Sequence, residues 1–278
     1  MKKSSTDTCC LTLPLKLEKW QEDRLAKRFE IARQLYNTLV HAELKRLAQV
    51  KQTAEYRENE RKIRTLDWNN PAHRTELEKL YEERRKSLKK AGFTDNSFTT
   101  DMGKYYKHFR DNIGSSVAVH GIAPQVWAAF DKLLFKKGGK KVHCKRPGEV
   151  NSVQGYSRTG KSGGREIMFR GPYIEWKGLK LPLKLSPDNA YETDMLQLVR
   201  LVRRPGKRRD RWYAQLVLEG KPAIKADPVT GKAVHPIGSG PVGLDIGPQT
   251  LAYSAAGVAG LVELADRVQN IEQEKRRL

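Results

Sequence analysis

The chain has 278 residues and a formal net charge of +21, from 53 Lys and Arg against 32 Asp and Glu. This length allows two or three compact units, and no apolar run is long enough to span a membrane. Three cysteines without a Cys-x-x-Cys pair favour neither a disulfide framework nor a zinc site. The first residues contain no apolar signal segment, so we expect a cytoplasmic protein.

Basic side chains are concentrated in the middle and second half of the chain. Between Lys136 and Arg211 there are 20 basic and 7 acidic residues. Such an excess attracts polyanions, whereas a surface that only confers solubility usually mixes both signs. An anionic membrane surface is the main alternative partner. We predict a nucleic-acid interface, with the candidate contact residues Lys136, Lys137, Lys140, Lys141, Lys145, Arg146, Arg203, Arg204, Lys207, Arg208, Arg209, Arg211 and Trp212.

The first 66 residues change their hydrophobic period once. Leucines occupy alternate positions of residues 8–17, which predicts one strand. From Leu25 onward, apolar residues recur at spacings of three and four, which is the stripe of a helix. This helix is predicted to continue to about Leu66.

Three further helices are predicted before residue 137. Asn70 can cap one of them, Pro71 fits its first turn, and Gly92 suits a left-handed end. The inner stripe of this helix is predicted to be Leu77, Leu80, Tyr81 and Leu88. The other two helices are predicted at about 98–112 and 123–135.

The region after residue 138 consists of short strands separated by Gly, Pro, Asn and Asp. The predicted strands are 166–170, 173–176, 180–184, 195–203 and 211–219. The simplest arrangement is a β-barrel made from 8–17 and 166–219, with the helices inserted between its first and second strands. Among Trp176, Tyr173, Trp212 and Tyr213, alternate residues are expected to face a core and the others to be free to stack on bases.

Two glycine-rich patterns resemble phosphate loops in spacing alone. Residues 155–162 match the Walker A spacing, but no buried strand precedes them and no helix follows, so a flexible basic loop is predicted. Residues 238–243 match a dinucleotide pattern but come before a strand instead of after one. Neither pattern predicts a nucleotide site.

Asp245 is the main candidate for metal chemistry. Residues 241–247 read as a buried strand ending in a tight turn, and strands at 251–254 and 260–264 follow. Carboxylate oxygens suit Mg²⁺, and metal-dependent nucleases use two such ions. One aspartate cannot hold both, and the alternative interpretation is an aspartate that only shapes the turn.

The segment Val242-Gly243-Leu244-Asp245-Ile246-Gly247 resembles the first RuvC motif of the TnpB family, the transposon-encoded RNA-guided nucleases related to type V CRISPR effectors. Residues 211–218 resemble the strand that precedes this motif in the family. Residues 272–278 are similar to the start of the charged helix that follows it. The resemblance is specific over 211–278 and loose in the helical region.

The resemblance implies an α+β multidomain protein. Residues 1–17 and 138–225 would form a wedge β-barrel, and 18–137 an inserted helical recognition domain. Residues 226–240 would form a linker, and 241–278 the start of a ribonuclease-H-like RuvC domain.

The resemblance also implies a function. The partners would be a guide RNA and target double-stranded DNA, and guide pairing would supply most of the specificity. Asp245 would be the first Mg²⁺-binding carboxylate of an endonuclease. The family's later Glu, later Asp and zinc ribbon have no counterpart before Leu278, and Glu263 does not match its second motif. We therefore expect a truncated chain that binds nucleic acid without cleaving it.

Three other functions share part of this sequence pattern. A non-catalytic relative that binds RNA or represses DNA would have the same charge without needing Asp245. A sugar-kinase or actin-type ATPase also uses Gly-x-Asp-x-Gly, but near its amino terminus and with several hundred residues after it. A DNA-joining transposase would need a carboxylate triad or a catalytic tyrosine, and no such motif is recognisable.

Overall fold

The computed structural model describes residues 8–136, 139, 141–157, 166–185, 196–206, 209–220, 242–247, 250–255 and 257–263. The fold mixes helices and sheets, and it divides into two compact units, Met1–Ala223 and Ile224–Leu278. Within the described part, no helix has the length and apolar character needed to cross a membrane.

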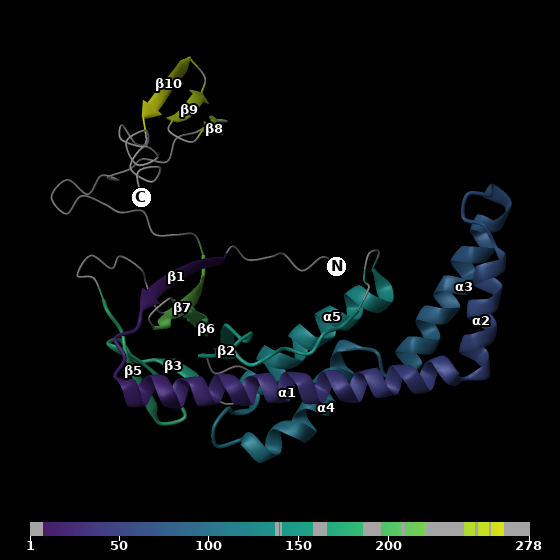
Figure 1. Ribbon diagram of the computed structural model, residues 1–278, viewed down its shortest axis with the longest axis horizontal. Helices are drawn as coiled ribbons and strands as arrows, with labels where there is room; N and C mark the ends of the chain where they lie inside the picture. The colour runs from purple at the N-terminus through teal and green to yellow at the C-terminus, as the bar shows by residue number, and fades with distance from the viewer. Residues whose placement is uncertain are drawn as a thin grey trace, which may run out of the picture. The chain divides into compact units, whose positions relative to one another are not determined.

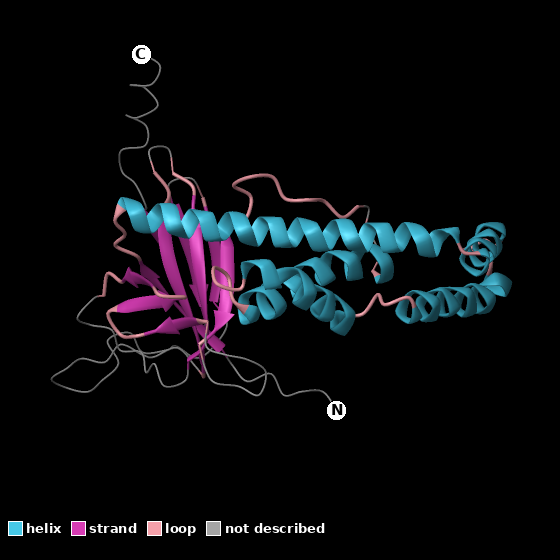
Figure 2. Ribbon diagram, turned by 90° about the horizontal axis from the view of Figure 1, so that it is seen from below, coloured by secondary structure: helices cyan, strands magenta, loops and turns pink. Residues whose placement is uncertain are grey.

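The long helix α1 (Lys19–Gln52) runs through the first unit, with α4 (Asp95–Tyr105) and α5 (Ala123–Phe135) beside it (Figures 1 and 2). A π-helix (Ser116–Ile122) leads directly into α5. The predicted stripe of α1 is confirmed, because its members are all buried: Leu25, Phe29, Ala32, Tyr36 and Leu39. These residues belong to one core cluster that continues into the sheets.

The single helix predicted as far as Leu66 is wrong, because it breaks at Thr53. Thr53 is extended, with φ −64° and ψ 145°, and it separates α1 from α2 (Ala54–Thr65). Its hydroxyl donates to the Val50 carbonyl at 2.8 Å and accepts from the Tyr56 amide at 3.3 Å. One threonine therefore ends the first helix and caps the second.

The helix α3 (Pro71–Lys90) starts as predicted, because the Asn70 side chain accepts from the Ala72 amide at 3.0 Å. Gly92 follows its end at φ +93°, as expected for a left-handed cap. The predicted inner stripe of α3 is wrong at Tyr81. It is 39% exposed and packs its ring against Trp68, while its three leucine companions are buried.

The helix predicted at 98–112 corresponds to α4, which begins and ends before the predicted bounds. Thr94 caps α4 by accepting from the Ser97 amide at 3.3 Å, so the helix starts at Asp95. After Tyr105 the chain tightens into a 3₁₀ helix (Tyr106–Phe109). The prediction of α5 at 123–135 is confirmed.

The larger sheet contains four antiparallel strands in the order β1-β7-β6-β2. These are β1 (Thr8–Pro14), β7 (Arg211–Glu219), β6 (Leu196–Arg204) and β2 (Ser152–Tyr156). The sequence prediction missed β2. The smaller sheet has the order β3-β4-β5 and consists of β3 (Ile167–Phe169), β4 (Tyr173–Trp176) and β5 (Leu179–Pro182).

The described strands of the first unit form two open sheets instead of the single closed barrel that we predicted. The sheets are linked by an isolated Leu15–Leu183 bridge, and the amides of Lys16 and Lys184 each donate at 2.8 Å to the carbonyls of Pro182 and Pro14. A continuous ladder is interrupted here because Pro14 and Pro182 have no N–H to donate.

Arg28 fastens α1 to the turn between β4 and β5. Its guanidinium donates to the carbonyls of Trp176 and, at 3.0 Å, of Lys177, and lies 5.0 Å from the centre of the Trp176 ring. Lys177 and Gly178 have φ values of 47° and 74°, as in a two-residue hairpin turn with both residues left-handed. Burial, followed by the charge of Arg24, lowers the Arg28 pKa to about 10.

The second unit contains a three-stranded antiparallel sheet in the order β10-β9-β8. Its strands are β8 (Val242–Ile246), β9 (Thr250–Ala255) and β10 (Val258–Glu263). The three predicted strands are confirmed, but β8 is exposed throughout, which corrects its prediction as a buried strand. The predicted linker (226–240) and the charged run 272–278 lie outside the described residues.

A buried carboxylate joins α1 to α4. The Glu43 side chain has no exposed surface, and its Oε2 lies 2.9 Å from Arg46 Nη1. Arg46 also pairs with Asp101, which in turn lies 2.7 Å from Lys104 Nζ. Burial, with the nearby charge of Asp101, raises the pKa of Glu43 to about 7, against the opposing charge of Arg46.

Arg28→Met should lower the free energy of unfolding by about 2–3 kcal/mol, because it removes a charged donor from two carbonyls. Chemical denaturation would measure this loss. The matched control is Arg24→Met, four residues earlier and exposed on the same helix, where we expect less than about 0.5 kcal/mol. Equal losses in the two variants would contradict the role assigned to Arg28.

The raised pKa of Glu43 predicts a pH-dependent stability. Between about 4.5 and about 7 the folded chain holds a proton that the unfolded chain has released, so stability should fall as pH rises through this window. Glu43→Gln removes this dependence. The free energy of unfolding of the variant minus that of wild type should therefore be larger at pH 8 than at pH 5, by roughly 2 kcal/mol. Denaturation curves at both pH values would test this, and a stability difference that does not change with pH would refute it.

Candidate nucleic-acid interface

A groove of about 420 Å³ lies where the end of β1, the end of β5 and the β6–β7 hairpin meet. We call it the hairpin groove. The backbone fixes its walls, since the Leu15 amide donates to the Trp212 carbonyl at 2.9 Å and Leu15 also bridges to Leu183. Three segments far apart in sequence therefore present their side chains to one depression.

Four exposed cations line the hairpin groove: Lys16, Lys184, Arg209 and Arg211. Among the residues that the structure describes, none of them forms an ion pair. Two acidic residues, Glu22 and Asp210, also line the groove. Asp210 lies 3.6 Å from Arg203, which is not one of the four groove cations. Solvated cations without carboxylate partners attract phosphates and release counterions when they bind them.

Lys16 and Lys184 were not among the predicted contact residues. Each follows a leucine that faces the core, Leu15 and Leu183, so strand alternation places each lysine on the outer side. That alternation is visible in the sequence. Their proximity is not, because it depends on how the two sheets are joined.

Arg203 and Arg204 are adjacent but differ in their surroundings. The Arg203 side chain is only 15% exposed, donates to the Gly148 carbonyl and lies 3.4 Å from Asn151 Oδ1. It holds a loop against β6, and its contact with nucleic acid stays a prediction. Arg204 is exposed, with its guanidinium 4.7 Å from the centre of the Tyr213 ring.

The predicted contacts near residue 140 are also mixed. Lys145 is half-buried, with Nζ 3.1 Å from Gln125 Oε1 and 4.3 Å from the centre of the Tyr36 ring, and burial lowers its pKa. These contacts hold its ammonium group within the fold, and its contact with nucleic acid stays a prediction. Lys136 pairs with Asp131 at 2.7 Å. The exposed remainder are Lys141 and Arg146, whereas Lys137, Lys140, Lys207 and Arg208 lie outside the described residues.

The aromatic residues alternate as predicted. Trp176 is fully buried and donates from Nε1 to the Ile113 carbonyl at 3.0 Å. Trp212 is 5% exposed and meets Phe29 edge-on at 5.1 Å. The ring is part of the core and has little surface for stacking on a base. Tyr173 and Tyr213 are partly exposed on the opposite face.

The Walker A pattern begins inside a strand. Gly155 and Tyr156 belong to β2, and residues 158–165 lie outside the described part. A methyl group on Gly155 would come within 3.0 Å of Val117 Cγ2, so this glycine permits close packing against the π-helix. The predicted loop is therefore wrong for these two residues, and glycine here has a packing role.

Asp245 lies exposed on β8 and pairs in register with Ala252 of β9. Glu263 is on β10, and β9 separates the two strands, which places the backbones of β8 and β10 roughly 10 Å apart across the sheet. Within the described part of the chain, no three His, Cys, Asp or Glu side chains cluster as a metal site. These residues alone do not fit the expected pair of Mg²⁺ ions.

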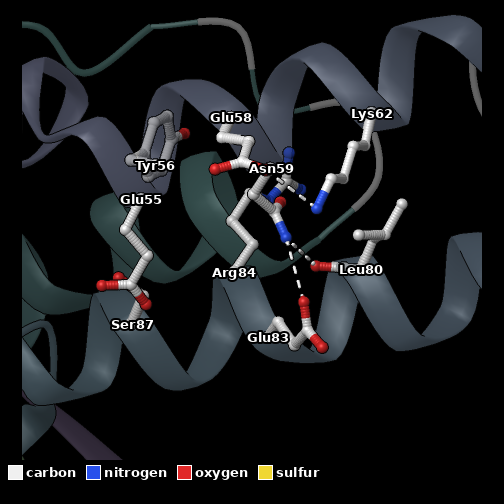
Figure 3. Close-up of a pocket in the computed structure, with 9 residues that line it drawn as sticks. All are labelled: Glu55, Tyr56, Glu58, Asn59, Lys62, Leu80, Glu83, Arg84 and Ser87. Carbon is white, nitrogen blue, oxygen red and sulfur yellow. Dashed lines mark hydrogen bonds and ion pairs between the residues drawn. The ribbon is translucent and has the colours of Figure 1, made fainter.

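A smaller cavity of about 190 Å³ lies between α2 and α3 (Figure 3). Asn59 donates from Nδ2 to the Leu80 carbonyl at 3.1 Å and lies 3.5 Å from Glu83, while Lys62 pairs with Glu58 at 3.0 Å. The hydrogen bonds of Asn59 hold the two helices together, although its Oδ1 is buried without a hydrogen-bond partner in the described part of the chain.

No protein-family model matches the chain, and no curated protein sequence matches it. Among solved structures, it is similar to a chain in a cryo-EM structure of a CRISPR-Cas12f ternary complex, with 13% identity and a TM-score of 0.34. The similarity covers 94% of this chain and 55% of the other. At these values the two chains are not shown to share a fold.

Proposed function

We propose that this chain binds structured RNA and that the hairpin groove contacts the sugar-phosphate backbone. The observation that carries the proposal is the meeting of Lys16, Lys184, Arg209 and Arg211, four exposed cations without carboxylate partners among the described residues. The net charge of +21 adds a long-range attraction. RNA phosphates are the partner that this arrangement suits best.

We further propose that the RNA is the guide of an RNA-guided DNA nuclease of the TnpB kind, with target double-stranded DNA as a second partner. The support is the resemblance of residues 242–247 and 211–218 to that family, together with the order of elements, one strand, then helices, then further strands. In this role Asp245 is the first carboxylate of a Mg²⁺ site. Other carboxylates would have to complete it.

The second candidate is a protein that binds RNA or DNA without cutting it, for example as a repressor. The observation that favours it is that all residues lining the hairpin groove belong to the first unit, so binding there needs no metal site on β8. Both candidates need the hairpin groove, and only the nuclease needs Asp245.

Replacing the four groove cations with Gln should weaken RNA binding and flatten its dependence on salt. Four fewer phosphate contacts should reduce the slope of log affinity against log salt concentration by about 3. Binding of a labelled structured RNA over a salt series would measure both quantities.

The matched control removes the same charge from the exposed side of α3, by replacing Lys79, Lys86, Lys89 and Lys90 with Gln. The control should keep most of the affinity. Equal loss in the two variants would mean that only net charge matters, and the groove would lose its assigned role.

Asp245→Ala should leave RNA affinity within about twofold, or ~0.4 kcal/mol, of wild type, because β8 belongs to the second compact unit and the groove to the first. A tenfold loss would contradict this. Mg²⁺-dependent cleavage of matched DNA that disappears in Asp245→Ala would support the nuclease and would overturn our expectation that this chain binds without cleaving.

A further inference from the structure

A second depression, of about 600 Å³, lies between α3 and the C-terminal end of α5. Three aromatic side chains line it: Trp68, Tyr81 and Phe135. Trp68 is 48% exposed and Tyr81 is 39% exposed, and their rings meet edge-on at 6.2 Å. Exposed aromatic rings that share a concave site are binding surfaces more often than packing defects. We call this site the aromatic pocket.

Backbone interactions hold Trp68 in place although its ring is half in solvent. The Asn69 amide donates to Asp67 Oδ1 at 2.9 Å, and the Asp67 amide donates to His73 Nδ1 at 3.1 Å. Arg74 Nε lies 3.4 Å from the Trp68 carbonyl itself. The ring is therefore presented by a fixed turn, so a ligand that stacks on it pays little ordering entropy.

The cations that line the aromatic pocket differ in their partners. Arg84 is committed, because it pairs with Glu60 at 2.9 Å and covers the Tyr81 ring at 4.9 Å. Arg85 covers Phe135 at 5.8 Å and forms no ion pair among the described residues. Lys136 is two-thirds exposed, although it pairs with Asp131. Arg85 is thus the cation available to a phosphate, and the exposed Lys136 can contact one only by sharing its charge with Asp131.

We propose that the aromatic pocket receives one unstacked base of a bound RNA, which stacks on Trp68 while its phosphate contacts Arg85 and Lys136. This rests on the proposed RNA-binding function and adds a site to it. Aromatic faces bind bases of any sequence, and neighbouring cations bind the attached phosphate. Glu78 and Glu82, which also line the pocket, offer acceptors to the N–H groups of a base edge.

The combination of an arginine unpaired among the described residues, an exposed lysine and exposed rings favours a nucleotide. An apolar peptide or a second copy of the chain would use the rings but would leave Arg85 and Lys136 without a role. A nucleotide uses both kinds of group, and a pocket of this volume falls in the range of small-ligand sites.

The test compares a single-stranded poly(C) oligonucleotide with an abasic strand of the same length and charge. Wild type should prefer the strand with bases by about tenfold, because stacking of a base contributes on the order of 1–3 kcal/mol. Trp68→Ala should lose this preference while the salt dependence of its binding stays unchanged. Trp20→Ala is the matched control. Trp20 is 51% exposed and carries an arginine over its ring at 5.8 Å, but it lies outside the aromatic pocket.

The outcomes are distinguishable. A preference that is lost in Trp68→Ala and kept in Trp20→Ala supports the proposal. A preference kept in both overturns it while leaving RNA binding by the hairpin groove intact. A change in molecular mass in solution in Trp68→Ala alone, with the preference for bases kept, would assign the pocket to a second copy of the chain instead. No binding of either strand or of structured RNA by wild type would overturn this inference and the proposed function together.

Discussion

The first unit depends on a buried guanidinium that reaches from its longest helix into a hairpin turn. Arg28 donates to the carbonyls of Trp176 and Lys177. Gln21, about two turns earlier on the same face of the helix, donates to the Lys180 carbonyl at 2.8 Å. Trp176 extends the connection by donating to Ile113. The helix therefore fixes the smaller sheet, and the smaller sheet brings Lys184 beside Lys16. Without this attachment the hairpin groove would lose one of its walls.

The basic residues divide by their surroundings into two kinds. Arg28, Arg203 and Lys145 are partly or fully buried and donate to carbonyl or side-chain oxygens, so their charge is used within the fold. Arg209 and Arg211 keep their solvent shell and have no carboxylate partner among the described residues. Counting charges along the sequence cannot separate these kinds. Burial separates them, because a cation that is buried and hydrogen-bonded within the fold is not accessible to a phosphate.

Much of the fold follows from local sequence. The remaining parts are set by tertiary contacts and could not be predicted in this way. The Asn70 cap, the alternation in residues 8–17 and the strand at 211–219 were predictable because each is encoded by neighbouring residues. The break at Thr53 was not, because a threonine in a charged helical stretch gives a weak signal. In the site, Arg209 and Arg211 were predicted, whereas Lys16 and Lys184 require the joining of two sheets. The burial of Trp212 required knowing which face of β7 meets Phe29.

Crosslinking tests the central claim most directly. RNA carrying photoreactive uridines would be bound to the chain at low salt, irradiated, and the attached peptides identified by mass spectrometry. The account predicts crosslinks within residues 14–17, 182–185 and 209–213, the three segments that form the hairpin groove. Crosslinks confined to the second unit, or spread evenly over all basic segments, would contradict it.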